Sequence, residues 1–126
     1  MKNVLVDTSV WVAHFREHNP SLVQLLHQGR VLIHPMVVGE LACGTPPERT
    51  STLANLSLLQ QTQVATIAEV LVFIEQEKLY GMGCGLVDVQ LLASTLITPN
   101  TELWTLDQRL ASLAQRLGAL HHPTFH

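Results

Sequence analysis

The sequence has little charge, few aromatic residues and no long apolar run. Charged side chains make up 13% and aromatic side chains 5% of the 126 residues, and the formal net charge is −3. Proteins that hold nucleic acid by charge alone are basic, so a polyanionic substrate would have to be attracted here by metal ions or a local arginine cluster. No apolar run reaches the roughly 18 residues of a membrane-spanning helix, and the start has no signal-peptide layout, so we expect a cytoplasmic protein.

Cysteine is also scarce. The chain has two cysteines, Cys43 and Cys84, which do not form a C-x-x-C motif, and we expect both to be reduced. A length of 126 residues suffices for one domain with a real core, which we expect to span residues 1–126. Apolar residues make up 47% of the chain, a high share for a soluble monomer, so we expect a partner to cover part of the apolar surface.

Two kinds of apolar segment alternate along the chain. Short runs predict strands at residues 3–6, 30–34, 63–66 and 102–106, and a further short strand at 119–120. Helical periodicity predicts helices at about residues 10–15, 21–28, 36–43, 46–59, 68–79, 87–96 and 108–117. Residues 45–48 (TPPE) resemble a capping box at the start of the fourth helix. Strands that alternate with helices indicate an α/β fold with a mainly parallel sheet and helices on both faces.

Four of the ten acidic residues occupy unusual positions. Asp7 and Asp107 each directly follow a predicted strand, and because the strands are parallel, both acids belong to the same edge of the sheet. Glu40 and Asp88 are on predicted helices, each on the face that packs inward and near a helix end that could open onto this edge. Structural explanations also exist: N-caps for Asp7 and Asp107, a first-turn acid for Asp88, and a partly exposed helix residue for Glu40.

Taken together, the four carboxylates predict a metal-dependent active site. Like charges held close together raise one another's pKa and destabilise the fold unless a cation lies between them. Oxygen ligands alone suit Mg²⁺ or Mn²⁺, which keep coordination positions open for water and phosphate oxygens. The chemistry that such a site supports best is hydrolysis of a phosphodiester by a metal-activated water.

Four short blocks of the chain resemble, in order, those of the PIN-domain nucleases. They are Asp7-Thr8-Ser9 and residues 39–44 (GELACG), 88–94 (DVQLLAS) and 103–107 (LWTLD). At this length the chain is similar to a VapC-type toxin of a bacterial toxin–antitoxin pair. The resemblance covers nearly the whole chain, and it implies a three-layer α/β/α sandwich with a central, mainly parallel sheet. It also implies Mg²⁺- or Mn²⁺-dependent endoribonuclease activity, homodimerisation, and inhibition by a cognate VapB-type antitoxin that inserts into or beside the active site.

The acids of that family match Asp7, Glu40, Asp88 and Asp107 of this chain. The resemblance implies that Asp7 and Asp88 are metal ligands. It implies that Glu40 and Asp107 complete the metal shell, directly or through water, and help to orient the attacking water.

The resemblance also assigns roles to hydroxyl residues beside these acids. It implies that Thr8, Ser9 and Thr105 hydrogen-bond the carboxylates and fix their rotamers. The chain departs from the family after Asp107, where some members have another acid close behind and this chain has Gln108-Arg109-Leu110. This departure weakens the expectation of a second, well-occupied metal site.

Arginines supply candidate contacts for an RNA substrate. Arg16, Arg49 and Arg109 could each contact a phosphate, for which the arginine fork is well suited. Arg109 has the best position, two residues after Asp107, although each arginine could equally be an ordinary solvated side chain. The glycine-rich segment 81–85 predicts a flexible, close-packing loop.

Histidines give weaker signals. His34 ends the second predicted strand near the expected cleft, and we expect it in the core rather than in catalysis. His14 and His18 have a helical spacing that can bind zinc, but no third ligand is evident. We expect the histidines of the tail to be exposed to solvent: His121, His122 and His126.

Two rival functions remain open at the level of the sequence. One is a phosphatase or phosphotransferase with Asp7 as an aspartyl nucleophile, which is disfavoured by Ser9, where a second aspartate would be needed, and by the absence of lysine from the last third of the chain. The other is a catalytically degenerate PIN fold that only binds RNA or protein. Retention of all four acids speaks against it.

Overall fold

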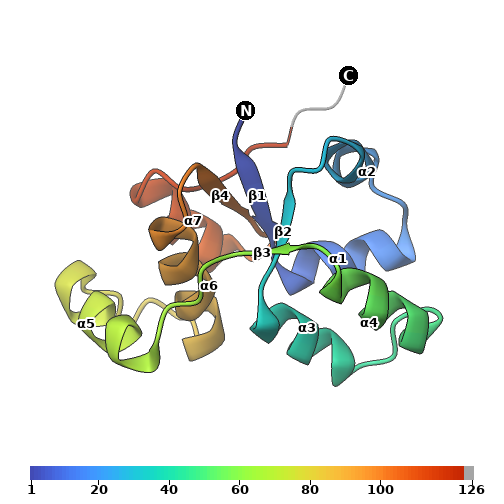
Figure 1. Cartoon of the computed structure of the whole chain (residues 1–126). Helices are drawn as coiled ribbons and strands as arrows, with labels where there is room; N and C mark the ends of the chain where they lie inside the picture. Colours follow the sequence, from blue (N-terminus) through green and yellow to red (C-terminus); the bar gives the residue numbers. More distant parts are fainter. Residues whose placement is uncertain (124–126) are drawn as a thin grey trace.

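Four parallel strands form the centre of the fold (Figure 1). The computed structural model describes residues 1–123. Its strands are β1 (Asn3–Val6), β2 (Val31–Ile33), β3 (Gln60–Gln61) and β4 (Thr101–Trp104), in the order β3-β2-β1-β4. β1 pairs with β2 and β4, β2 pairs with β3, and every pairing is parallel. The predicted α/β class with a mainly parallel sheet is confirmed.

Seven helices in the described part of the chain surround this sheet. They are α1 (Thr8–Arg16), α2 (Pro20–His27), α3 (Pro35–Ala42), α4 (Arg49–Ser57), α5 (Ile67–Glu77), α6 (Leu86–Ile97) and α7 (Gln108–Arg116). Figure 1 places α1 to α4 on one side of the strands and α5 to α7 on the other, and the main helix contacts lie within these two groups. The architecture is a three-layer α/β/α sandwich. Within residues 1–123, no helix is both long and apolar enough to cross a membrane.

The two central strands are buried because helices cover both faces of the sheet. Residues 4–6 of β1 and residues 31–33 of β2 are at most 3% exposed. A parallel strand buried on both faces has a continuous apolar sequence rather than an alternating one, as both runs show. Helices on both sides pack side chains into the same core, including Leu22, Val37, Leu91 and Leu110.

The predicted capping box at residues 45–48 is wrong. The helix α4 begins only at Arg49, and Glu48 precedes it in a left-handed conformation, with φ of 45° and no side-chain cap. A capping box needs the residues after its threonine in the first helical turn. A residue that precedes proline is disfavoured in the helical conformation, so Pro46-Pro47 keeps this segment out of the helix.

The third strand lies earlier in the chain than predicted. It is β3, which pairs with the end of β2, whereas residues 63–66 form no strand. Side chains of α6 satisfy the backbone there instead. The Oγ of Ser94 accepts a hydrogen bond from the Ala65 N–H at 3.0 Å, and Gln90 Nε2 donates to the Ala65 carbonyl oxygen at 3.0 Å. Because buried backbone groups need partners, these contacts replace a strand neighbour.

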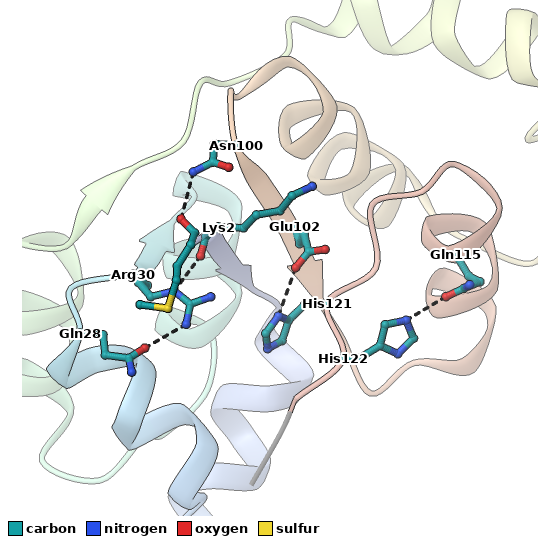
Figure 2. A network of polar contacts seen from close by, with 9 residues as sticks. Lys2, Gln28, Arg30, Asn100, Glu102, Gln115, His121 and His122 are labelled. Atoms are coloured by element: carbon teal, nitrogen blue, oxygen red, sulfur yellow. Dashed lines mark hydrogen bonds and ion pairs between the residues drawn. The ribbon is translucent and has the colours of Figure 1, made fainter.

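A polar network lies at the edge of the sheet where β1 and β4 begin (Figure 2). His121 Nδ1 is 3.4 Å from Glu102 Oε1, and the pKa of His121 is lowered, chiefly by burial. The predicted strand at residues 119–120 is reduced to one parallel bridge between Leu103 and Leu120. Figure 2 also shows Arg30 bonded to Lys2 and Gln28, Asn100 bonded to the first residue, and His122 bonded to Gln115.

Candidate active site

Asp7 lies where the central strand β1 ends and α1 begins. It is the N-cap of α1 and is 5% exposed. Its Oδ1 accepts a hydrogen bond from the Thr8 N–H at 2.7 Å, and its Oδ2 accepts from the hydroxyls of Ser9 at 2.8 Å and Thr105 at 2.7 Å. Three donors compensate a buried carboxylate for lost water and restrict its rotamer. Capping accounts for one carboxylate oxygen, and the two hydroxyl contacts go beyond what a cap needs.

Thr105 and Asp107 follow β4, which is paired with β1. The register of the two strands places Asp7 opposite Thr105, not opposite Asp107. The strand predicted to end at residue 106 ends at Trp104, because the chain then folds back: Thr105 Oγ1 accepts a hydrogen bond from the Asp107 N–H at 3.1 Å. Asp107 caps α7 by accepting a hydrogen bond from the Leu110 N–H at 2.9 Å, and it is exposed.

Glu40 lies on the exposed side of α3, beside the start of α1. Its Oε1 accepts a hydrogen bond from the Thr8 hydroxyl at 2.7 Å. The prediction that Glu40 faces inward is wrong, because the buried residues of α3 are Val37 and Leu41. Glu40 instead borders a groove of about 510 Å³ between α1 and the end of α3. This groove is lined by Thr8, Val12, Phe15, Arg16, Glu40, Leu41 and residues 44–47.

Asp88 lies in the first turn of α6 and is partly buried. Its Oδ2 accepts a weak hydrogen bond from the Gly85 N–H at 3.4 Å. The pKa of Asp88 is raised, chiefly by burial. The hydrogen bond from the Gly85 N–H lowers this pKa, and the negative charges of the other three acids, Asp7, Asp107 and Glu40, raise it further. The charges of the other three acids therefore reach Asp88, although the four acids come from four separate segments of the chain.

The donor chemistry of these acids fits a hard divalent cation, but their side chains do not yet form a ligand shell. All four are oxygen donors, as Mg²⁺ and Mn²⁺ prefer. Within residues 1–123, no three His, Cys, Asp or Glu side chains lie close enough to hold a metal ion together. Glu40 and Asp107 are turned toward protein donors, the Thr8 hydroxyl and the Leu110 N–H. Cation binding would therefore require some of these side chains to rotate toward Asp7.

Comparison with known proteins identifies the fold family. The PIN-domain family matches residues 4–117, a range that includes all four acids. The chain belongs to the PIN-domain family. Over 115 residues this PIN domain is 40% identical to the protein named Ribonuclease VapC32 of Mycobacterium tuberculosis, in strains CDC 1551 / Oshkosh and ATCC 25618 / H37Rv. Each alignment covers 91% of this chain and 93% of its relative.

Two of the three candidate arginines occupy the α1–α4 side of the PIN domain. Arg49 donates from Nη2 to the Ala42 carbonyl oxygen at 2.6 Å and from Nε to the Gly44 carbonyl oxygen at 3.3 Å. Carbonyls at a helix C-terminus need donors, so Arg49 stabilises the end of α3. Arg16 lines the groove beside Glu40.

Arg109 lies on the other side of the PIN domain, against the glycine-rich loop. A Cβ atom at Gly83 would lie 2.7 Å from Arg109 Cδ. The pKa of the Cys84 thiol is raised, chiefly by burial and further by the charges of Asp88 and Asp107. The charge of Arg109 acts in the opposite direction and lowers this pKa. Arg109 is therefore in the electrostatic environment of two of the acids. The sequence indicated a close-packing loop, but nothing in it showed that the loop packs on Arg109.

His34 is a core residue, as expected. It is 0% exposed, and burial lowers its pKa. Its Nδ1 accepts a hydrogen bond from the Met36 N–H at 3.0 Å, so the neutral ring carries its proton on Nε2 and donates to Ser94 Oγ at 3.0 Å. His34 thus caps α3 and links it to α6, the two helices that carry Glu40 and Asp88.

The remaining histidines form no metal site in the described part of the chain. His14 Nδ1 accepts a hydrogen bond from the Asn19 N–H at 3.0 Å, and the rings of His14 and His18 are 5.0 Å apart. The prediction of a solvent-exposed tail is wrong for His121, whose side chain is partly buried against Glu102, whereas His122 is exposed. His126 lies outside the described residues.

Proposed function

We propose that this PIN-domain protein is a metal-dependent endoribonuclease of VapC type, which hydrolyses RNA phosphodiester bonds and acts as the toxin of a toxin–antitoxin pair. The observation that carries the proposal is the buried carboxylate of Asp7, held by three donors at the end of the central strand, where the charges of Asp7, Asp107 and Glu40 also reach Asp88. Carboxylates near one another repel and destabilise the fold, and a bound cation would relieve this repulsion. Family membership and 40% identity to a protein named a ribonuclease support the substrate class.

In this proposal, Asp7 and Asp88 hold Mg²⁺ or Mn²⁺, and Glu40 and Asp107 complete the metal shell directly or through water. When bound, the cation would polarise the phosphodiester of the RNA and activate a water molecule for attack. The buried carboxylate of Asp7 is the anchor of the site, because three donors already fix its position. We expect cleavage to leave 5′-phosphate and 3′-hydroxyl ends.

Three hydroxyl groups prepare the ligands for this task. Ser9 and Thr105 donate to Asp7, and Thr8 donates to Glu40. Contacts of this kind orient ligand carboxylates and tune their affinity. Ser9 Oγ also accepts a hydrogen bond from the Leu106 N–H at 3.0 Å, which ties the segment after β4 to the start of α1.

We further propose that the chain forms a single PIN-like domain over residues 1–126 and works in the cytoplasm as a homodimer with a cognate VapB-type antitoxin. Unpartnered apolar side chains on α5 support an oligomer: Ile67 is 51% exposed, Leu71 56% and Val72 55%. The groove beside Glu40 is lined partly by apolar residues, and an antitoxin segment bound there would lie next to Glu40.

The test of this function is RNA cleavage by the purified, antitoxin-free protein. Total RNA is incubated with the protein and with Asp7→Asn, in EDTA, Mg²⁺ or Mn²⁺, and the new ends are mapped. We expect discrete, metal-dependent cuts that Asp7→Asn abolishes. No cuts, also in RNA from the native host, would contradict the proposal. RNA binding without cleavage in both proteins would favour the degenerate binder, and a trapped phospho-aspartate would favour the phosphatase.

A further inference from the structure

Gly83 makes room for the side chain of Arg109. A Cβ atom at Gly83 would lie 2.7 Å from Arg109 Cδ and 3.0 Å from both Nε and Nη1, and these are the three nearest atoms it would meet. The backbone at Gly83 has a φ of 82°, which favours glycine. Arg109 Nη1 also points to the Gly83 carbonyl oxygen at 3.5 Å. The loop and the arginine therefore pack directly against each other.

We propose that Gly83 is a positioning residue that holds Arg109 on the side of the site that carries Asp88 and Asp107, where its guanidinium binds a phosphate of the RNA. This inference rests on the proposed function for its substrate class. It connects two features that the catalytic acids leave unused, the glycine-rich loop and the exposed arginine that follows Asp107.

The charge of Arg109 is close to two of the acids without being paired to them. Arg109 and the acids Asp88 and Asp107 all act on the same thiol, that of Cys84. Within residues 1–123, no carboxylate oxygen lies within 4.0 Å of the Arg109 guanidinium. A guanidinium that is near a metal-dependent site but not neutralised by it is available to a substrate phosphate, to which it can donate two parallel hydrogen bonds.

An exposed arginine needs help to stay in such a position. Its long side chain has many rotamers, and ordering them costs free energy that weakens binding. Packing on Gly83 restricts these rotamers before the RNA arrives. Arg49 gives the contrast, since its guanidinium is occupied by the carbonyls of Ala42 and Gly44.

Substitution of Gly83 should move Arg109 and leave the fold intact. The atoms that an added Cβ would meet belong to the flexible side chain of an exposed residue, not to backbone. Gly81 provides the matched control, because it has a similar φ of 71° and a Cβ atom added there would meet no atom within 4 Å. Gly83→Ala and Gly81→Ala therefore share the backbone strain, and only the first displaces Arg109.

The experiment measures RNA binding in the full-length Asp7→Asn background, so that no RNA is cut. A labelled single-stranded RNA is titrated by fluorescence anisotropy, at several salt concentrations, with Gly83→Ala, Gly81→Ala, Arg109→Ala and the Gly83→Ala/Arg109→Ala double variant. We expect Arg109→Ala to raise Kd about tenfold and to lower the salt slope by about 0.7, the contribution of one phosphate contact. Gly83→Ala should show most of the rise in Kd and most of the fall in salt slope. The double variant should bind RNA no more weakly than Arg109→Ala alone, and Gly81→Ala should bind like the Asp7→Asn protein.

Several results would overturn the inference. They are the absence of RNA binding, an unchanged Kd for Arg109→Ala or Gly83→Ala, additive losses in the double variant, and an equal loss for Gly81→Ala. A Gly83→Ala protein that fails to fold while Gly81→Ala folds would also contradict it, because only a side chain should have to move. Failure of the proposed function is seen separately, as absence of RNA cleavage by the protein with Asp7 intact.

Discussion

Replacement of Thr105 by valine tests how the site holds its central acid. Valine has nearly the shape of threonine but no hydroxyl. The hydroxyl of Thr105 donates to Asp7 Oδ2 at 2.7 Å and accepts from the Asp107 N–H at 3.1 Å, and Thr105 is 7% exposed. The variant therefore removes one donor from a buried carboxylate and one acceptor from the turn that leads into α7.

The expected cost follows from these two contacts. A hydrogen bond to a charged group contributes about 1.5–3 kcal/mol, so we expect Thr105→Val to lower the free energy of unfolding by about 2 kcal/mol. For a chain of this length, that loss corresponds to a fall in Tm of roughly 6–10 °C. Loss of a group that orients a metal ligand typically costs about 10–100-fold in metal affinity or activity, so RNA cleavage should fall by that factor.

The matched control is Thr105→Ser, which keeps the hydroxyl and removes a methyl group. It should lose about 1 kcal/mol of stability from reduced apolar burial and keep its cleavage rate within about threefold. Thermal melting and single-turnover cleavage of one RNA are measured for all three proteins. A Thr105→Val protein that cleaves as fast as the serine variant would refute the role of this hydroxyl.

Three further predictions concern stability. Asn19→Ala should lower the free energy of unfolding by about 1 kcal/mol, because Asn19 Oδ1 caps α2 through the Leu22 N–H, and Asn19→Asp should restore most of it in thermal melts. Burial lowers the pKa of His34 below its ordinary value of 6.5, so below that pH the unfolded chain takes up a proton that the folded chain does not. The free energy of unfolding should therefore fall as the pH is lowered from about 7.5 to 5.5. In His34→Asn this fall should be smaller, by up to about 1.4 kcal/mol at pH 5.5. Urea unfolding at several pH values measures it, and an equal fall in both proteins would contradict the prediction. Asp88→Asn should stabilise the metal-free protein by about 0.5–1 kcal/mol, because the variant no longer keeps a charge partly buried and a partly screened repulsion is relieved. In thermal melts, Mg²⁺ should raise the Tm of the unaltered protein but not that of the variant.

The sequence predicted the parts of the fold that rest on local patterns. The apolar run of β1 and the continuous apolar run of β2 identified the central strands, because burial on both faces leaves a clear signature. The strand β3 was missed because it consists of two exposed glutamines at an edge of the sheet. Its position depends on pairing with β2, which a local pattern does not contain.

The sequence indicated which segments of the chain carry the candidate acids, but not how their side chains are arranged. Asp7 occupies the end of its strand as predicted, whereas the turn after Trp104 puts Thr105 in the corresponding place on β4. Helical spacing predicted an inward Glu40, but it could not show that Val37 and Leu41 alone are buried. The contact between Gly83 and Arg109 joins segments 26 residues apart, and only the fold brings them together.

The central claim is that Asp7, Glu40, Asp88 and Asp107 together bind one catalytic cation, and Mn²⁺ binding tests it most directly. The paramagnetic signal of free Mn²⁺ is followed as the protein is added, for the unaltered chain and for Asp7→Asn, Glu40→Gln, Asp88→Asn and Asp107→Asn. We predict saturable binding by the unaltered chain, lost in Asp7→Asn and Asp88→Asn and weakened in the other two. No binding by the unaltered chain, or undiminished binding by Asp7→Asn and Asp88→Asn, would contradict the claim.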